Sequence, residues 1–207
     1  ACGQLNQPVY PALPGIDQFQ GQAFHSARWR HDIDLSGKRV AVIGTGASAI
    51  QFVPQIQPKV VQLQLFQRSP AYVLAKPDRL YRAWELALMR RMPWLQVIDR
   101  GFEYLYHEVR GLAFISMPWL MKVYRFSFER HLNQHIRDLR LRAQLQPDYP
   151  MGCKRILISN DFYPALARPN VNVISSAISH VSADAIITAD GREHPCDVLI
   201  YGTGFTA

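Results

Sequence analysis

A glycine-rich turn is the first segment of the chain whose residue types and spacing suit a chemical role. It has the spacing G-x-G-x-x-A over residues 44–49. It follows the apolar, β-branched run 38–43, which predicts a buried parallel strand, and it opens a helical pattern over 47–56. At such a junction the first glycine allows a tight turn, the second lets a pyrophosphate approach the backbone, and the alanine permits close helix packing. We therefore expect a dinucleotide at this helix N-terminus; the alternative is a glycine turn kept only for packing. The expected contacts are Gly44, Thr45, Gly46, Ala47, Ser48 and Gln51.

The end of the next strand indicates which dinucleotide binds. A second strand is predicted over 60–66, and the residues after it are Gln67, Arg68 and Ser69. NAD sites place a carboxylate here to accept a hydrogen bond from the ribose 2′-hydroxyl, and these three residues include none. A guanidinium and a hydroxyl suit a 2′-phosphate instead, so the sequence favours NADP(H) over NAD(H). The alternative is that Arg68 is a solvated surface arginine.

A third motif lies upstream, in the segment FQGQAFHSARW. It places Phe19, Gly21, His25 and Trp29 at fixed spacing. This pattern resembles the fingerprint of the Baeyer–Villiger monooxygenases, flavin enzymes that insert oxygen next to a ketone carbonyl. The family pattern usually continues with Pro or Asp, whereas Arg30 follows here, which leaves the wider class of flavin-containing monooxygenases open. The family histidine is linked to coordinating the domains; the alternative for His25 is a buried histidine that satisfies backbone groups at a hinge.

The resemblance extends to residues 149–155, which are similar to the family segment Y-P-x-G-x-K-R. In the family the lysine approaches the NADP 2′-phosphate, and the arginine points to the flavin and stabilises the negatively charged peroxyflavin. By position these residues are Lys154 and Arg155. The resemblance thus implies a catalytic role for Arg155; the residues by themselves predict only a basic turn.

Both ends of the chain resemble the linkers that join the NADP domain to the flavin domain in this family. Residues 1–3 resemble the first linker and 202–205 the second, and Thr203 and Gly204 are counted among the expected cofactor contacts. We therefore expect the chain to be a fragment of a longer protein that binds FAD through a G-x-G-x-x-G upstream of residue 1. The isolated fragment is expected to be colourless and inactive.

The rest of the sequence predicts an α/β fold, a Rossmann-like NADP-binding domain that carries a helical insertion. Residues 1–35 are expected to form a linker and fingerprint segment, in which Pro8, Pro11 and Pro14 favour extended backbone over regular helix. Apolar residues at helical spacing fill the insertion in three stretches, 81–88, 98–112 and 121–139. A β-hairpin is expected around Asp190-Gly191, between strands at 185–188 and near Pro195. Two further strands are expected at 171–174 and 197–201, and the NADP-binding domain comprises 36–77 and 148–207, with 78–147 as the insertion.

Composition narrows the class of protein. The 207 residues carry a net charge of +7, and residues 79–147 of the insertion hold 12 of the 23 Lys and Arg residues but only 6 of the 16 Asp and Glu residues. The sequence contains no run of about 18 apolar residues, so it predicts no transmembrane helix. The three cysteines have neither disulfide nor zinc spacing, so we expect no metal site and a reducing cytoplasm. The motifs assign the basic charge to a phosphate-bearing small molecule rather than to nucleic acid.

The resemblance implies an NADPH- and FAD-dependent monooxygenase whose partners are NADPH, O₂ and a small organic substrate. Baeyer–Villiger oxidation of a ketone is expected, with oxygenation of sulfur or nitrogen as a variant. One alternative is the NADP domain of a flavin disulfide reductase, although the chain lacks a C-x-x-C or C-x₄-C pair. The other is a non-catalytic dinucleotide or lipid-surface module, in which Trp84, Trp94 and Trp119 of the insertion meet a membrane. A substrate-access cap with a solvated basic face is the expected role of the insertion.

Overall fold

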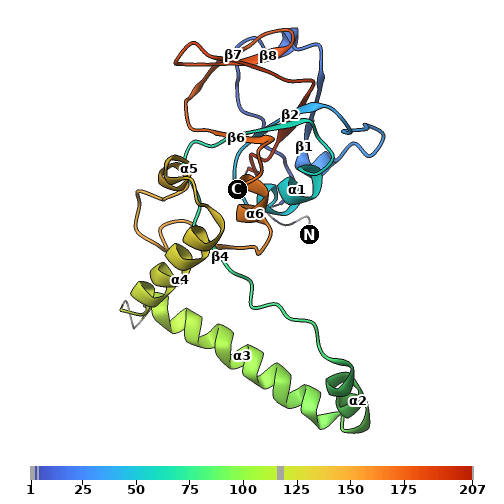
Figure 1. The fold of residues 1–207 in the computed structure, drawn as a ribbon, viewed down its shortest axis with the longest axis vertical. Helices are drawn as coiled ribbons and strands as arrows, with labels where there is room; N and C mark the ends of the chain where they lie inside the picture. Colours follow the sequence, from blue (N-terminus) through green and yellow to red (C-terminus); the bar gives the residue numbers. More distant parts are fainter. Residues whose placement is uncertain (1–2, 4, 116–118, 207) are drawn as a thin grey trace.

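A five-stranded parallel sheet forms the centre of the computed structural model, which describes residue 3, residues 5–115 and residues 119–206. Its strand order is β1-β10-β2-β3-β6, and all four neighbouring pairs are parallel. Helices flank it, so the predicted mixed α/β class is confirmed (Figure 1). The strands are β1 (Gln22–His25), β2 (Arg39–Ile43), β3 (Gln62–Phe66), β6 (Val171–Ile174) and β10 (Val198–Tyr201).

Alternation along the strands creates two cores, one on each face of the sheet. Val40 and Val42 of β2 point to the face covered by α1 (Ala49–Ile56) and α6 (Phe162–Leu166). Ala41, between them, points to the opposite face and a smaller core. Both faces are therefore buried, which explains why β2 is apolar from Val40 to Ile43.

The second face is covered by a three-stranded antiparallel sheet. Its strands are β7 (Ile178–Val181), β8 (Ala185–Thr188) and β9 (Glu193–Pro195). Asp190 and Gly191 turn the chain between β8 and β9, with Gly191 at φ 76°, so the predicted hairpin is confirmed.

The predicted linker over 1–35 contributes a strand to the main sheet. Its residues 22–25 form β1, the edge strand of the main sheet, in register with β10 so that His25 pairs with Tyr201. Two short 3₁₀ helices, Ile16–Gln18 and Ser26–Arg28, flank the strand. The strand was not predicted, because pairing with β10, at the far end of the sequence, supplies the order that a short local pattern lacks.

The third helical stretch, predicted over 121–139, is also corrected. It divides into α4 (Leu120–His135) and α5 (Leu139–Gln144). Ile136 is extended at φ −105° and ψ 106°, and its side chain is buried in the larger core. The carboxylate of Asp138 then accepts a hydrogen bond from the Arg140 N–H at 2.8 Å and caps α5. Burial of Ile136 thus outweighs continuation of the helix.

A paired stem connects these helices to the sheet. β4 (Val73–Leu74) and β5 (Leu157–Ile158) run parallel, and the Asn160 side chain exchanges two hydrogen bonds with the backbone of Lys76. Between the two sides of the stem lie α2 (Ala83–Arg91), α3 (Trp94–Ile115), α4 and α5. Figure 1 shows α2 and most of α3 projecting away from the sheet.

Two parts of this helical region differ sharply in burial. In α4, Phe128 and Leu132 are buried in the larger core, and the Phe128 ring meets that of Tyr72 at 4.9 Å. Trp84, Trp94 and Trp119 are instead more than half exposed. Among the helices that the structure describes, none combines the length and apolarity needed to cross a membrane.

Candidate functional site

The glycine-rich turn lies at the carboxyl end of β2, where the sequence placed it. Gly44 has φ 101°, and its N–H donates to the Phe66 carbonyl at 2.9 Å. A Cβ added to Gly44 would lie 2.6 Å from the Gly202 carbonyl oxygen. One added to Gly202 would lie 3.3 Å from the Cβ of Ala49, which is fully buried. Gly44 and Ala49 therefore meet the steric demands that the motif predicts.

No steric contact within the described residues requires glycine at position 46. Its added Cβ would meet only the Gly202 oxygen, at an ordinary 3.7 Å, and the residue is exposed. Within the described part of the chain, the backbone N–H groups of residues 45–49 have no backbone acceptor, and the first helical bond runs from Ile50 N–H to the Gly46 carbonyl. Free donors beside an uncrowded glycine fit a phosphate. The Gln51 side chain is exposed on the first turn of α1.

The end of β3 meets the 149–155 segment across a long sequence separation. The Lys154 ammonium Nζ donates to the Ser69 hydroxyl Oγ at 2.7 Å, and the Thr45 hydroxyl reaches the Ser69 carbonyl at 3.4 Å. Arg68, one residue earlier, is exposed. Cationic and hydroxyl groups predicted from separate motifs thus converge beside the glycine-rich turn.

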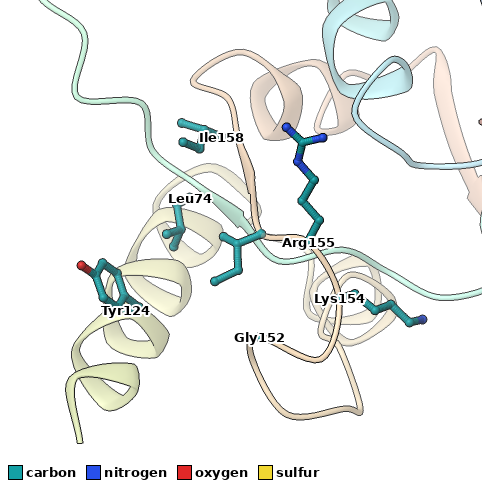
Figure 2. A pocket seen from close by; sticks show the side chains of 7 residues that line it. Leu74, Tyr124, Gly152, Lys154, Arg155 and Ile158 are labelled. Atoms are coloured by element: carbon teal, nitrogen blue, oxygen red, sulfur yellow. The ribbon is translucent and has the colours of Figure 1, made fainter. Parts of the chain in front are cut away.

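The side chains of Arg155 and Lys154 point in different directions. Figure 2 shows the two neighbouring side chains diverging from the same turn. Arg155 borders a cavity of about 330 Å³ with a mainly apolar lining. The lining residues are Leu74, Tyr124, Gly152, Lys154, Arg155, Ile156 and Ile158. Both residues thus border the cavity, while the Lys154 ammonium reaches the Ser69 hydroxyl and the Arg155 guanidinium points elsewhere (Figure 2).

Thr203 and Gly204 lie in a backbone pairing instead of a helix turn. The Thr203 hydroxyl donates to the Val9 carbonyl, and the Gly204 carbonyl accepts from the Val9 N–H at 3.0 Å. The spacing G-x-G-x-x-A also occurs at 202–207. Here, however, residues 203–206 pair with residues 7–9 and do not open a helix. Their expected contact with a cofactor stays a prediction. Ala1 and Cys2 of the expected first linker lie outside the described residues.

The fingerprint histidine is buried beside the pairing between residues 7–9 and 203–206. His25 is 0% exposed, and its ring meets those of Tyr10 at 5.5 Å and Phe205 at 5.6 Å. Its Nδ1 accepts from the Ala27 N–H at 3.0 Å. Burial lowers the pKa of His25 below its ordinary value, so the ring is neutral at pH 7.

The other fingerprint residues pack the edge of the sheet. A Cβ at Gly21 would come within 2.5 Å of both the Asp197 carbonyl and the Phe19 ring, so only glycine fits there. Trp29 meets Phe24 of β1 and Phe52 of α1, each with ring centroids 5.3 Å apart. These contacts give the fingerprint a structural role in joining β1 to the rest of the domain.

Two polar residues near the site were missed from the sequence. Gln67 is buried, and its side-chain amide donates to the Gln144 carbonyl at 2.8 Å, which ties α5 to the end of β3. Tyr149 contacts both Lys154 and the segment after Ser69. The only signal for Tyr149 was its place at the start of the Y-P-x-G-x-K-R segment.

The geometry of the glycine-rich turn, the fingerprint and the Lys-Arg turn agrees with the result of comparing the sequence with known families. The sequence model described as "Flavin-binding monooxygenase-like" matches residues 2–207. The chain belongs to this flavin-binding monooxygenase-like family. The resemblance inferred from the motifs is therefore confirmed, and family membership decides against the disulfide-reductase alternative.

Relatives within the family include two bacterial Baeyer–Villiger monooxygenases. The protein from Pseudomonas aeruginosa is 51% identical over 205 residues, and the one from Streptomyces coelicolor is 48% identical over 205 residues. Each match covers 99% of this chain but only 39% and 40% of the relative, respectively. The chain thus spans about two fifths of the length of these curated relatives.

Solved structures of the family share the fold. An oxidized steroid monooxygenase bound to NADP superimposes with a TM-score of 0.80 at 28% identity, over 100% of this chain and 46% of that one. The OTEMO complex with FAD and NADP superimposes with a TM-score of 0.79 at 26% identity, over the same shares of the two chains.

Substitution of the two glycines separates folding from binding. Gly44→Ala should lower the free energy of unfolding by at least about 1–2 kcal/mol, because φ 101° disfavours a Cβ and the Gly202 oxygen lies in its way. Gly46→Ala should change stability by less than about 1 kcal/mol yet weaken NADP⁺ binding about tenfold or more. Urea denaturation and calorimetric titration measure the two quantities. Gly46→Ala binding NADP⁺ like the wild type would remove this glycine from the site.

The buried His25 should make stability fall on mild acidification. Its folded-state pKa lies below the ordinary 6.5, so the unfolded chain binds a proton first as pH falls, and the free energy of unfolding decreases from about pH 7.5 to 5.5. His131 and His194, whose pKa values burial also lowers, contribute in the same direction. His25→Asn keeps an acceptor for the Ala27 N–H but does not titrate.

Urea denaturation of both proteins across this pH range checks the contribution of His25. The variant should be less stable at pH 7.5 but show a shallower decrease than the wild type. An unchanged slope would mean that His25 is not protonated preferentially in the unfolded state.

Proposed function

We propose that the chain binds NADP(H) at the carboxyl ends of β2 and β3, as the NADP-binding part of an FAD-dependent monooxygenase. The observation that carries this proposal is the Lys154–Ser69 contact of 2.7 Å beside Arg68 and the glycine-rich turn. It places hydroxyl and cationic groups where an NAD site would need a carboxylate. The NADP-bound relatives support the same reading.

The domain division predicted from the sequence belongs to this proposal. Residues 36–77 and 148–207 would form the NADP-binding domain, and 78–147 a helical insertion. The stem supports this division, because the chain leaves β3 and returns before α6 through hydrogen-bonded partners. Within the insertion, α4 packs on the core whereas α2 and most of α3 project from it (Figure 1).

Each part of the dinucleotide has a distinct partner in the site. The free N–H groups of 45–49 would bind the pyrophosphate, with Gly46 giving it room and Thr45, Ala47, Ser48 and Gln51 around it. Arg68, Ser69 and Lys154 would bind the 2′-phosphate through charge-assisted hydrogen bonds. NADP(H) bound in this way supplies a hydride, and FAD in the full-length protein supplies reaction with O₂.

Arg155 would act where the flavin and the substrate meet. Its guanidinium stays charged at any working pH, and the neighbouring 330 Å³ cavity is mainly apolar. A fixed cation beside a poorly solvated space stabilises negative charge that develops there. A small ketone, whose carbon skeleton is apolar, suits the cavity and would yield an ester or lactone. Oxygenation of sulfur or nitrogen is the variant that the same site supports.

A membrane-surface role for the helical region is the second candidate. The exposure of Trp84, Trp94 and Trp119 favours it, together with the excess of Lys and Arg in 79–147. Flotation with anionic liposomes tests it, since a solvated cap stays at the bottom of the gradient.

Removal of the guanidinium at the end of β3 should reduce affinity for the 2′-phosphate alone. Arg68→Ala should weaken NADP⁺ binding by about 1.5–3 kcal/mol, or about 10- to 150-fold, and change NAD⁺ binding little. Isothermal titration calorimetry measures both. Arg192→Ala, at an exposed arginine of the β8–β9 hairpin, is the matched control. Equal affinity of the wild-type chain for NADP⁺ and NAD⁺ would contradict the proposal.

Arg155 should separate the two half-reactions of the full-length protein that carries these residues. Arg155→Ala leaves the NADP-binding groups in place, so flavin reduction by NADPH should persist. Ester formation should fall at least about tenfold, with NADPH oxidation diverted to hydrogen peroxide, because the stabilising charge is gone. Stopped-flow reduction and product analysis on the same variant check this. Wild-type ester yield per NADPH would leave Arg155 as a basic turn residue only.

A further inference from the structure

Tyr149 begins the Y-P-x-G-x-K-R segment, of which the proposed function uses only the lysine and the arginine. Its side chain is half-buried and lies against Lys154, whose Nζ is 4.4 Å from the centre of the Tyr149 ring. The same Nζ donates to Ser69 at 2.7 Å. The aromatic ring and the Ser69 hydroxyl therefore hold the ammonium group between them.

The Tyr149 hydroxyl contacts the opposite side of the site. It donates to the Pro70 carbonyl at 2.9 Å, one residue after Ser69. In return, the Tyr72 hydroxyl donates to the Tyr149 carbonyl at 2.8 Å, and the two rings meet edge to face at 5.5 Å. Tyr149 thus fixes the backbone that carries Ser69 while its ring supports Lys154.

The turn between Tyr149 and Lys154 brings these two side chains together. The Cys153 N–H donates to the Pro150 carbonyl at 3.2 Å, and Gly152 has φ 100°. A glycine at positive φ in the third position of a four-residue turn reverses the chain direction. Lys154 consequently comes back over the ring of the residue that starts the segment.

Lysine needs such support more than arginine does. Its ammonium is a point charge on a flexible four-carbon stem, and ordering that stem costs conformational entropy. An aromatic face attracts the ammonium and confines it. We infer that Tyr149 is a positioning residue that holds Lys154 and Ser69 together as one 2′-phosphate subsite and so sets the preference for NADP(H) over NAD(H). This inference rests on the proposed function.

Calorimetric titration of the 207-residue chain with NADP⁺ and with NAD⁺ tests this role. Tyr149→Leu removes the ring and the hydroxyl, and should weaken NADP⁺ binding about fivefold or more while changing NAD⁺ binding less than about twofold. Tyr149→Phe keeps the ring under Lys154 and loses only the Pro70 bond, so it should weaken NADP⁺ binding about two- to threefold. Titration with adenosine 2′,5′-bisphosphate and with 5′-AMP repeats the test of the 2′-phosphate contribution with ligands that lack the nicotinamide half.

Coupling to Lys154 distinguishes positioning from a general packing role. If Tyr149 acts through Lys154, Tyr149→Leu should add less than about twofold to the loss caused by Lys154→Ala. Full additivity would overturn the inference, as would equal losses for NADP⁺ and NAD⁺. If Tyr149→Leu does not fold, Tyr149→Phe in the same cycle decides, and wild-type NADP⁺ affinity in that variant overturns the inference.

The wild-type chain separates failure of this inference from failure of the proposed function. A wild-type preference for NADP⁺ that survives in the Tyr149 variants overturns the inference alone. No wild-type preference overturns the proposed function and the inference with it.

Discussion

Pairing between the segment that leaves β3 and the segment that returns to α6 is the contact on which the candidate site depends. Ser69 and Lys154 are separated by 85 positions, so only this pairing brings them within hydrogen-bond distance. The strands β4 and β5, the Asn160 amide and the Tyr72 and Tyr149 hydroxyls bridge the two segments along their length.

A second pairing closes the other side of the glycine-rich turn. Residues 7–9 and 203–206 are hydrogen-bonded to each other, and the buried His25 packs beneath them. The same stretch carries Gly202, whose carbonyl lies against Gly44. The glycine-rich turn is therefore set between two non-local contacts. These contacts fix both flanks of the turn and so preorganise its N–H donors.

The features that were predictable from sequence are those with a strong local pattern. The apolar run of β2 and the following glycine-rich turn fixed the position of the βαβ unit, and Asp190-Gly191 marked the hairpin. β1 was missed because its order comes from β10, and the two-residue strands of the stem are too short to show alternation. The helix break at Ile136 comes from burial of that side chain in the core, which the local apolar pattern does not show. The position of Lys154 followed from family resemblance, whereas the role inferred for Tyr149 needed its spatial neighbours.

Phosphorus NMR of NADP⁺ bound to the chain tests most directly whether Arg68, Ser69 and Lys154 form one 2′-phosphate subsite. A phosphate monoester loses its last proton with a pKa of about 6, and nearby cations favour the dianion. Titration of the 2′-phosphate resonance should therefore give a pKa clearly below that of free NADP⁺, and Lys154→Ala should move the pKa back toward the free value. A bound 2′-phosphate that titrates like free NADP⁺ would contradict a cationic subsite at the end of β3.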